Sequence, residues 1–424
     1  MFDVELIQSG ADVNSITGAE SLRTESPGSK TPVFHKLFAK LRRISQRRNT
    51  HWALSALFLI GLVSGFHQLR LPFNVNWERM FSAYWGGLAV RAMFCTVLLY
   101  VIGFPLDRTV KPLWHRYLSQ KPRFLVLVLF SAAMLWEFGP ALGVVVVVDG
   151  IALAELFDRC QDDLDSILGF IKSLMPASAY LFFGLVMMFA YNDLIASSKF
   201  LGAYDQLFLK LDSYFLHRST VSEIAHRILS HLSASELSAI EFIYYGMFGQ
   251  IGAALILVAG FSGRKEALRY VGTILTAYYL ALIIFYLCPS MGPFYSCPHH
   301  FANFPRSLAT YNIQQSAILK FRLLASPYRS LNQVDTDYFI AFPCMHVAQP
   351  LIVLWFLRGW KRIAIALVIY DVLLVPAILL LEWHYLVDLA GGIVVTAVSI
   401  TLTGDNILDF RRKPSSDLTA RFAY

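Results

Sequence analysis

Apolar residues form long runs along most of the chain, and short polar or basic segments separate these runs. A bilayer core is about 30 Å thick, so a helix of about 20 apolar residues can cross it. The pattern therefore predicts an all-α, polytopic integral membrane helical bundle. We expect spans at residues 52–66, 84–104, 174–195, 237–260, 268–287, 345–357, 363–383 and 385–402.

A further apolar run, residues 124–156, is too long for one comfortable crossing at about 1.5 Å per residue. Gly139-Pro140 interrupts it, and this pair is a strong helix breaker. We interpret the run as a hairpin of two short crossings, which gives ten crossings in the whole chain.

Basic residues test this map, because Lys and Arg gather on the cytoplasmic side of a membrane. With ten crossings, five basic segments fall on one side, at residues 34–48, 107–123, 263–269, 358–362 and 411–413. We therefore expect both termini in the cytoplasm and the segment 289–341 on the extracytoplasmic face. The membrane we expect is a bacterial inner membrane.

Composition supports a membrane protein. Of the 424 residues, 56% are hydrophobic and 15% are charged, and the mean hydropathy is +0.53. Soluble domains carry about a quarter charged residues. The net charge of +7 comes from basic residues beside apolar runs, so it indicates orientation in the membrane and not nucleic acid binding. No Walker loop, G-x-G-x-x-G or H-E-x-x-H motif is present.

The same pattern divides the chain into regions. Residues 1–33 are polar and aperiodic, which predicts a disordered cytoplasmic N-terminus. Residues 34–50 read as a basic amphipathic helix on an anionic leaflet, or else as a solvated basic linker. We expect about four N-terminal spans in residues 51–170, a six-span catalytic core in residues 171–403 and a cytoplasmic tail in residues 404–424.

Two segments of the core are not spans. Residues 204–216 are amphipathic and are expected to lie at the membrane interface. Residues 289–341 are too long for a simple connector, so we expect this loop to be functional.

Two histidine motifs flank one helical hairpin. The motif F-P-C-M-H ends at His346, and H-Y-L-V-D runs from His384 to Asp388. Two apolar helices joined by a short turn are antiparallel, so both motifs return to the same side of the membrane. Asp388 lies four residues after His384 and can share its helix face. Ionisable groups at a membrane edge indicate function, and a carboxylate there would fix the tautomer of the histidine.

These motifs, preceded by Y-L-C-P-S-M-G-P-F-Y at residues 286–295, resemble the type 2 phosphatidic acid phosphatase superfamily. The chain is most similar to its inositol phosphorylceramide synthase branch. The resemblance implies that His384 is the nucleophile, that Asp388 orients it and that His346 protonates the leaving oxygen. It also implies that the enzyme uses no metal or other cofactor.

The chain departs from the superfamily pattern at its phosphate-binding positions. The K-x6-R-P motif is missing, Ala377-Ile378 replaces the usual Ser-Arg, and Cys344 replaces a serine. Cationic donors must then come from the loop, where Arg329 is the first choice. Arg306, Lys320 and Arg322 are further candidates, and Tyr295 is expected to contact substrate.

Three other groups of residues have two readings. Cys344 is a small substitute for serine or a nucleophile, and His299-His300 is a polar loop or a metal ligand pair. Cys288 and Cys297 could form a disulfide if their compartment is oxidising.

The sequence thus favours an enzyme that transfers a phosphoryl-containing headgroup between lipids through a phosphohistidine. Its partners would be a lipid substrate and a hydroxyl acceptor, which is a lipid, a polyol or water. The alternative is a phosphatase of lipid phosphates or polyprenyl diphosphates that uses the same site. A metalloenzyme built on His346, His384 and Asp388 and a transporter are the remaining rivals.

Overall fold

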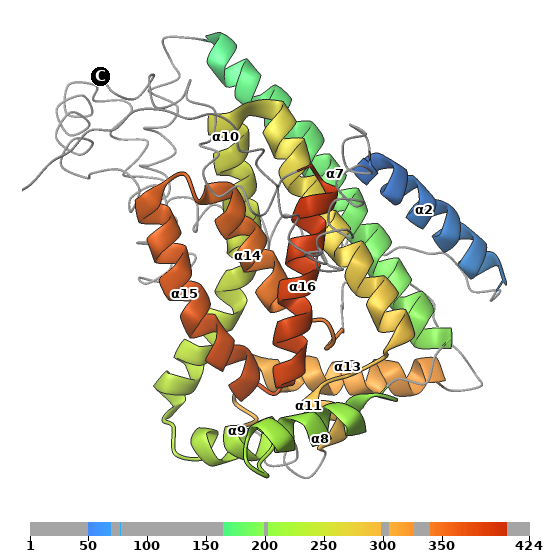
Figure 1. Cartoon of the computed structure of the whole chain (residues 1–424), viewed down its shortest axis with the longest axis vertical. Coiled ribbons are helices and arrows are strands. Elements are labelled where there is room, and N and C mark those ends of the chain that lie inside the picture. Colours follow the sequence, from blue (N-terminus) through green and yellow to red (C-terminus); the bar gives the residue numbers. More distant parts are fainter. Residues whose placement is uncertain are drawn as a thin grey trace, which may run out of the picture.

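The computed structural model describes residues 50–68, 77, 164–198, 202–297, 305–325 and 340–404. Within these residues every regular element is a helix, so the all-α prediction is confirmed (Figure 1). The predicted disordered N-terminus at 1–33 and the spans predicted between residues 84 and 156 fall outside the described residues. So do the basic helix at 34–50, apart from residue 50, and the tail at 404–424, apart from residue 404.

Long apolar helices form the bundle, and they agree with the spans expected from the sequence. Three of them are long and apolar enough to cross a membrane, and two are shorter apolar helices. They are α7 (Leu164–Ser198), α10 (Ala234–Leu287), α14 (Met345–Leu357), α15 (Lys361–Leu380) and α16 (Leu386–Leu402). A further helix, α2 (Thr50–Gln68), packs against α7, where the rings of Phe58 and Tyr191 meet edge to face.

Helix α10 is two antiparallel arms and not one rod. A straight helix of its 54 residues would be roughly 80 Å long, far more than a bilayer requires. Gly263 has a left-handed φ of 77° and breaks the helix, a conformation that suits glycine. The Tyr270 hydroxyl then donates to the Ile251 carbonyl across 2.9 Å, so the arms lie side by side (Figure 1). These arms correspond to the spans predicted at 237–260 and 268–287.

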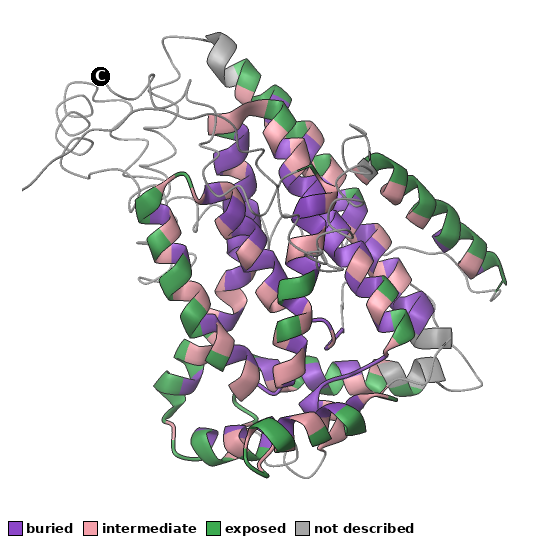
Figure 2. Cartoon of the chain, in the orientation of Figure 1, coloured by how far each residue is buried: buried purple, intermediate pink, exposed green. Residues whose placement is uncertain are grey.

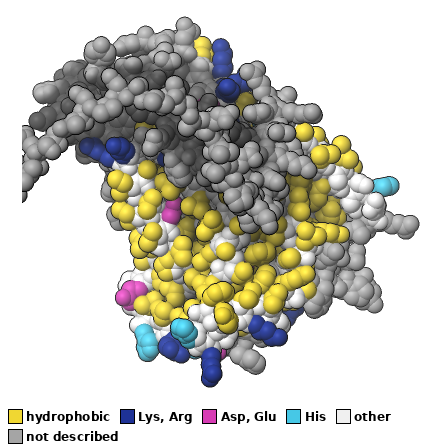
Figure 3. Space-filling model, viewed as in Figure 1, with side chains coloured by type: hydrophobic (Ala, Val, Ile, Leu, Met, Phe, Trp, Pro, Cys, Tyr) yellow, Lys and Arg dark blue, Asp and Glu magenta, His cyan; other side chains and the backbone are white. Residues whose placement is uncertain are grey.

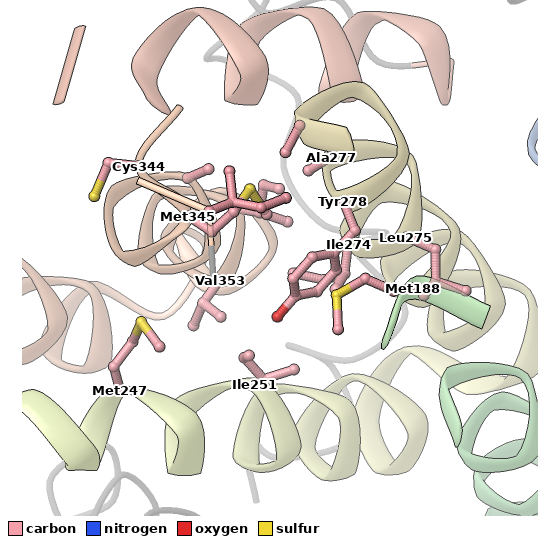
Figure 4. Packing of buried hydrophobic residues seen from close by; sticks show 14 of the residues in the cluster. Met188, Met247, Ile251, Ile274, Leu275, Ala277, Tyr278, Cys344, Met345 and Val353 are labelled. Atoms are coloured by element: carbon pink, nitrogen blue, oxygen red, sulfur yellow. The ribbon is translucent and has the colours of Figure 1, made fainter. Parts of the chain in front are cut away.

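The core of the bundle lies between α7, α10 and α14. Met188 from α7, Leu275 from the second arm of α10 and Val353 from α14 are all buried and point into the same cluster (Figure 4). Buried residues follow the facing sides of these helices, and exposed residues follow the outer side of α15 (Figure 2). Those outer residues are apolar, as expected for contact with lipid.

Hydrophobic side chains cover the middle of the molecule as seen in Figure 3, with Lys and Arg toward its two ends. On α15 the exposed side chains include Ile365, Ile369 and Val372. Such a surface is stable in lipid and costly in water. The protein is therefore an integral membrane protein.

The α10 turn, the α14–α15 turn and the end of α16 lie at one end of the bundle. The rings of Phe261, beside the α10 turn, and Trp360, in the α14–α15 turn, lie 5.4 Å apart. At the same end, the hydroxyls of Thr273 and Thr403 are 2.8 Å apart. Of the C-terminal segments that the charge rule assigned to one side of the membrane, 263–269 and 358–362 therefore lie together, and 411–413 falls outside the described residues.

The opposite end carries four short helices that cross the ends of the spans (Figure 1). Helix α8 (Asp205–Phe215) matches the predicted interfacial helix, and α13 (Ala309–Ala325) lies within the segment expected to be a loop. The other two are α9 (Val221–Leu229) and α11 (Pro293–Ser296). Both histidine motifs lie at this end.

Candidate active site

His346, His384 and Asp388 form one connected chain of side chains. His346 Nδ1 lies 2.9 Å from His384 Nε2, and His384 Nδ1 lies 3.2 Å from Asp388 Oδ2. His384 and Asp388 are buried, whereas His346 is half-buried. The structure thus brings together all three residues that the sequence selected.

Helix starts position these side chains. Met345 begins α14 two residues after Pro343, and Leu386 begins α16 two residues after His384. The Asp388 carboxylate accepts a hydrogen bond from the Tyr385 amide at 2.8 Å. The backbone carbonyl of Asp388 accepts one from the Cys344 amide at 3.0 Å. The second of these bonds joins the two motifs directly.

Two glycines of α16 allow this close approach. A Cβ at Gly392 would lie 2.4 Å from the Cys344 carbonyl oxygen, and one at Gly391 would lie 2.7 Å from the Phe342 ring. Any side chain at Gly392 would therefore force apart the start of α14 and the helix that carries Asp388.

With both imidazoles neutral, the contacts assign one arrangement of protons. A carboxylate can only accept, so His384 donates from Nδ1 and presents the lone pair of Nε2. His346 then donates from Nδ1 to this nitrogen, and its own Nε2 carries a lone pair. That Nε2 is buried and has no hydrogen-bond partner among the described residues.

Aromatic rings pack against His346 and against Trp383, the residue before His384. The Tyr244 ring stacks on His346 at 4.8 Å and on Trp383 at 5.8 Å, and Phe248 meets His346 edge to face at 6.1 Å. Phe294 meets Trp383 edge to face at 5.3 Å. These ring contacts keep the imidazole of His346 in one orientation. They could not be predicted from the sequence, because Tyr244 lies more than a hundred residues before its partners.

Helix α8 contacts each of the three sequence motifs through its buried side. The Asp205 carboxylate accepts from Ser290 Oγ at 2.7 Å and from the amides of Met291 and Gly292 at 3.1 and 3.2 Å. Burial raises the pKa of Asp205, and these hydrogen bonds partly offset the effect. This aspartate therefore holds the segment that follows α10.

Phe208 and Asp212 extend the same side of α8 to the histidine motifs. The Phe208 ring lies 5.1 Å from that of Phe342 and 5.8 Å from that of Tyr385. Asp212 Oδ1 accepts from the Leu386 amide at 3.0 Å and so caps the start of α16. Burial raises the pKa of Asp212 to about 7.

Glu382 is an unusual neighbour of the site that sequence reasoning missed. It is fully buried with a left-handed φ of 57°, and its carbonyl accepts from the Phe294 amide at 3.2 Å. Neither carboxylate oxygen makes a hydrogen bond of normal geometry to the described residues. Burial raises the pKa of Glu382 to about 8, partly offset by the Ser222 hydroxyl, so a proton is bound at neutral pH.

None of the proposed substrate contacts within the described residues is hydrogen-bonded or ion-paired to the triad of His346, His384 and Asp388. Arg306 is exposed before α13, and Tyr295 is half-buried beside Gly202. Lys320 is ion-paired with buried Asp193 at 2.7 Å, so it is not a free phosphate ligand. Arg322 is exposed on α13. Arg329 and the pair His299-His300 lie outside the described residues.

The cysteines near the site are thiols. Cys344 is buried at the start of α14, beside both histidines, and Cys288 and Cys297 are also free. In the described part of the chain, no Lys or Arg is hydrogen-bonded or ion-paired to the triad. A cation for the phosphate has therefore to come from elsewhere.

Comparison with known proteins now adds to this geometry. Residues 222–402 match the PAP2 superfamily. The match runs from α9 to the end of α16, so it contains both histidine motifs. PAP2 proteins are lipid phosphatases or phosphotransferases, and the match supports an enzyme of that kind in residues 222–402. No curated protein and no solved structure matches the chain.

The PAP2 match begins after α8. The helix that carries Asp205, Phe208 and Asp212 thus lies outside it, although its side chains contact all three motifs.

Proposed function

We propose that this PAP2 enzyme transfers a phosphoryl-containing headgroup from a donor lipid to a hydroxyl acceptor through a phosphohistidine at His384. The observation that carries the proposal is the chain from Asp388 through His384 to His346. Asp388 accepts a hydrogen bond from the Nδ1–H group of His384. The lone pair of Nε2 is therefore free to act as the nucleophile.

In the first step, His384 Nε2 forms a bond to phosphorus while the bond from phosphorus to the leaving oxygen breaks. His346, which carries a second proton on Nε2 in the reactive form, gives its Nδ1 proton to that oxygen as a general acid and is left as a neutral imidazole. In the second step, the acceptor hydroxyl gives its proton to His346 Nδ1 while its oxygen bonds to phosphorus and the bond to His384 breaks. The enzyme returns to its starting protonation.

The substrate has to separate the two imidazoles. Attack on phosphorus and proton donation to the leaving oxygen each require a contact of roughly 3 Å. His346 Nδ1 and His384 Nε2 lie only 2.9 Å apart, so no phosphoryl group fits between them as they stand. In the present arrangement the two rings satisfy each other.

Phosphate charge requires donors. The first amides of α14, beside His346, favour an anion at the helix start. We propose Arg329 and Arg306 as the cations and Tyr295 as a further substrate contact. No described Lys or Arg is bonded to the triad. This favours a diester headgroup as substrate, because a diester carries less negative charge than a terminal phosphate.

These surroundings favour a transferase similar to inositol phosphorylceramide synthases over a phosphatase. A transferase must exclude water and hold a second hydroxyl in line, and the aromatic residues around the triad suit that task. A phosphatase of lipid phosphates or diphosphates is the second candidate, because the same phosphohistidine can react with water.

The test uses purified protein and a phospholipid with a labelled headgroup phosphate. A transferase leaves label on His384 that is stable to alkali and labile to acid, and it moves the label to added lipid or polyol acceptors. Rapid release of phosphate from a lipid monophosphate, unaffected by any acceptor, would favour the phosphatase. Absence of labelled His384 with every donor would contradict both.

A further inference from the structure

We propose that Cys344, His346 and His384 form an inhibitory binding site for a thiophilic d10 metal ion such as Zn²⁺ or Cd²⁺. Cys344 Sγ and one ring nitrogen from each histidine lie within 4.8 Å of one another. The inhibition rests on the proposed function, because two of the ligands are the reacting histidines. The binding itself does not depend on it.

The donor set suits such an ion. Zinc prefers four ligands in a tetrahedron, with sulfur at about 2.3 Å and nitrogen at about 2.0–2.1 Å, so ligand atoms lie roughly 3.5 Å apart. The two ring nitrogens are already 2.9 Å apart, and Cys344 Sγ would be the third ligand. Thiolate and imidazole ligands favour zinc over magnesium or calcium, which bind oxygen. A water molecule would complete the tetrahedron.

The surroundings already support a metal ligand. Asp388 holds Nδ1 of His384, and a carboxylate on the second nitrogen is the usual support of a metal-bound histidine. His346 Nε2 is buried without a partner among the described residues, so it can take the proton that Nδ1 gives up when Nδ1 binds the ion. Cys344 would lose its thiol proton to solvent.

The bound ion would block phosphoryl transfer for a direct reason. It would occupy the lone pair of His384 that attacks phosphorus and the nitrogen of His346 that donates the proton. The thiol is what makes the site selective for soft ions, because a serine hydroxyl at position 344 is a poor ligand for them.

The experiment measures metal binding and turnover separately on the purified full chain. Titration with Cd²⁺ is followed by the ultraviolet absorption of the cadmium–thiolate bond. We expect about one ion per chain in the wild type and no such absorption at the site in Cys344→Ser. Cys288→Ser is the matched control, because this free thiol lies outside the cluster and its loss should leave the absorption unchanged.

Zinc inhibition is then measured on the labelled lipid reaction, with each variant compared to its own zinc-free rate. The half-inhibiting zinc concentration should rise more than tenfold in Cys344→Ser and stay unchanged in Cys288→Ser. Equal cadmium absorption in the wild type and Cys344→Ser would overturn the site, even if no lipid substrate is found. Unchanged or faster turnover with the ion bound would overturn the inhibition.

Discussion

At the scale of single residues, His384 and Asp388 have separable parts in the proposed reaction. Replacement His384→Ala removes the nucleophile, so we expect no turnover and no labelled protein. Replacement Asp388→Asn leaves a nucleophile but allows the wrong tautomer, which should slow turnover by roughly 10²–10⁴-fold. Labelled-lipid assays on purified variants measure both effects. Near-normal turnover in His384→Ala would end the phosphohistidine proposal, provided that the elution profile shows an intact fold.

Glu382 makes stability depend on pH. Its pKa is raised to about 8 by burial, so the folded state keeps a proton that the unfolded chain loses above the ordinary value of 4.5. The stabilisation is fully present below about pH 4.5 and is lost as pH rises through about 8. A shift of this size corresponds to roughly 5 kcal/mol at most.

Glu382→Gln should therefore remove much of this pH dependence, because an amide does not ionise. We expect thermal unfolding in detergent to give similar midpoints for wild type and variant at pH 5, and a higher midpoint for the variant at pH 9. Parallel curves for the two proteins across this range would contradict the assignment of a buried, protonated Glu382.

The sequence was sufficient to find the triad residues but not their neighbours. A hairpin length and an i, i+4 spacing are local facts, and they placed His346, His384 and Asp388 together. Glu382 and Tyr244 act through contacts that depend on how helices pack, and no local spacing reports those contacts.

At the scale of elements, α8 positions the start of α16 and the segment that follows α10. Asp212→Ala removes the acceptor for the Leu386 amide, and loss of a helix cap costs about 1 kcal/mol. Because that cap lies two residues from His384, we expect kcat to fall by about tenfold with little change in KM. Asp212→Asn keeps an oxygen acceptor and should recover most of the activity.

Gln206→Ala is the matched control on the exposed side of α8 and should behave as wild type. Equal losses in Asp212→Ala and Asp212→Asn would show that the hydrogen bond to Leu386 is not what matters. An unchanged kcat in Asp212→Ala would contradict the positioning role altogether.

Pattern alone predicted the long helices and α8, but not α9, α11 or α13. The amphipathic segment 204–216 was predicted because polar and apolar residues alternate along it. The two spans on either side of Gly263 were predicted because a short basic segment separates two apolar runs. Helix α13 was missed, because its sequence is neither continuously apolar nor strongly amphipathic. It is held by tertiary contacts such as Gln314 Nε2 donating to the Leu381 carbonyl at 2.8 Å.

At the scale of the whole molecule, the basic turns and the triad lie at opposite ends of the bundle. We predict that the triad end faces away from the cytoplasm, since Lys and Arg favour the cytoplasmic side. In a cysteine-free background, a cysteine at exposed Ser307 should react with an impermeant thiol reagent in intact cells. One at exposed Lys265 should react only after permeabilisation. The reverse pattern would move the chemistry to the cytoplasm.

The contact between His346 and His384 has a consequence for the choice of substrate. The two rings have to be separated before phosphorus can be attacked, and the free energy for separating them must come from parts of the substrate that do not react. Acyl chains in the membrane and the rest of the headgroup are those parts. A soluble fragment with the same phosphoester would therefore react slowly even at saturation, so discrimination against water-soluble phosphate esters would appear in kcat and not only in KM.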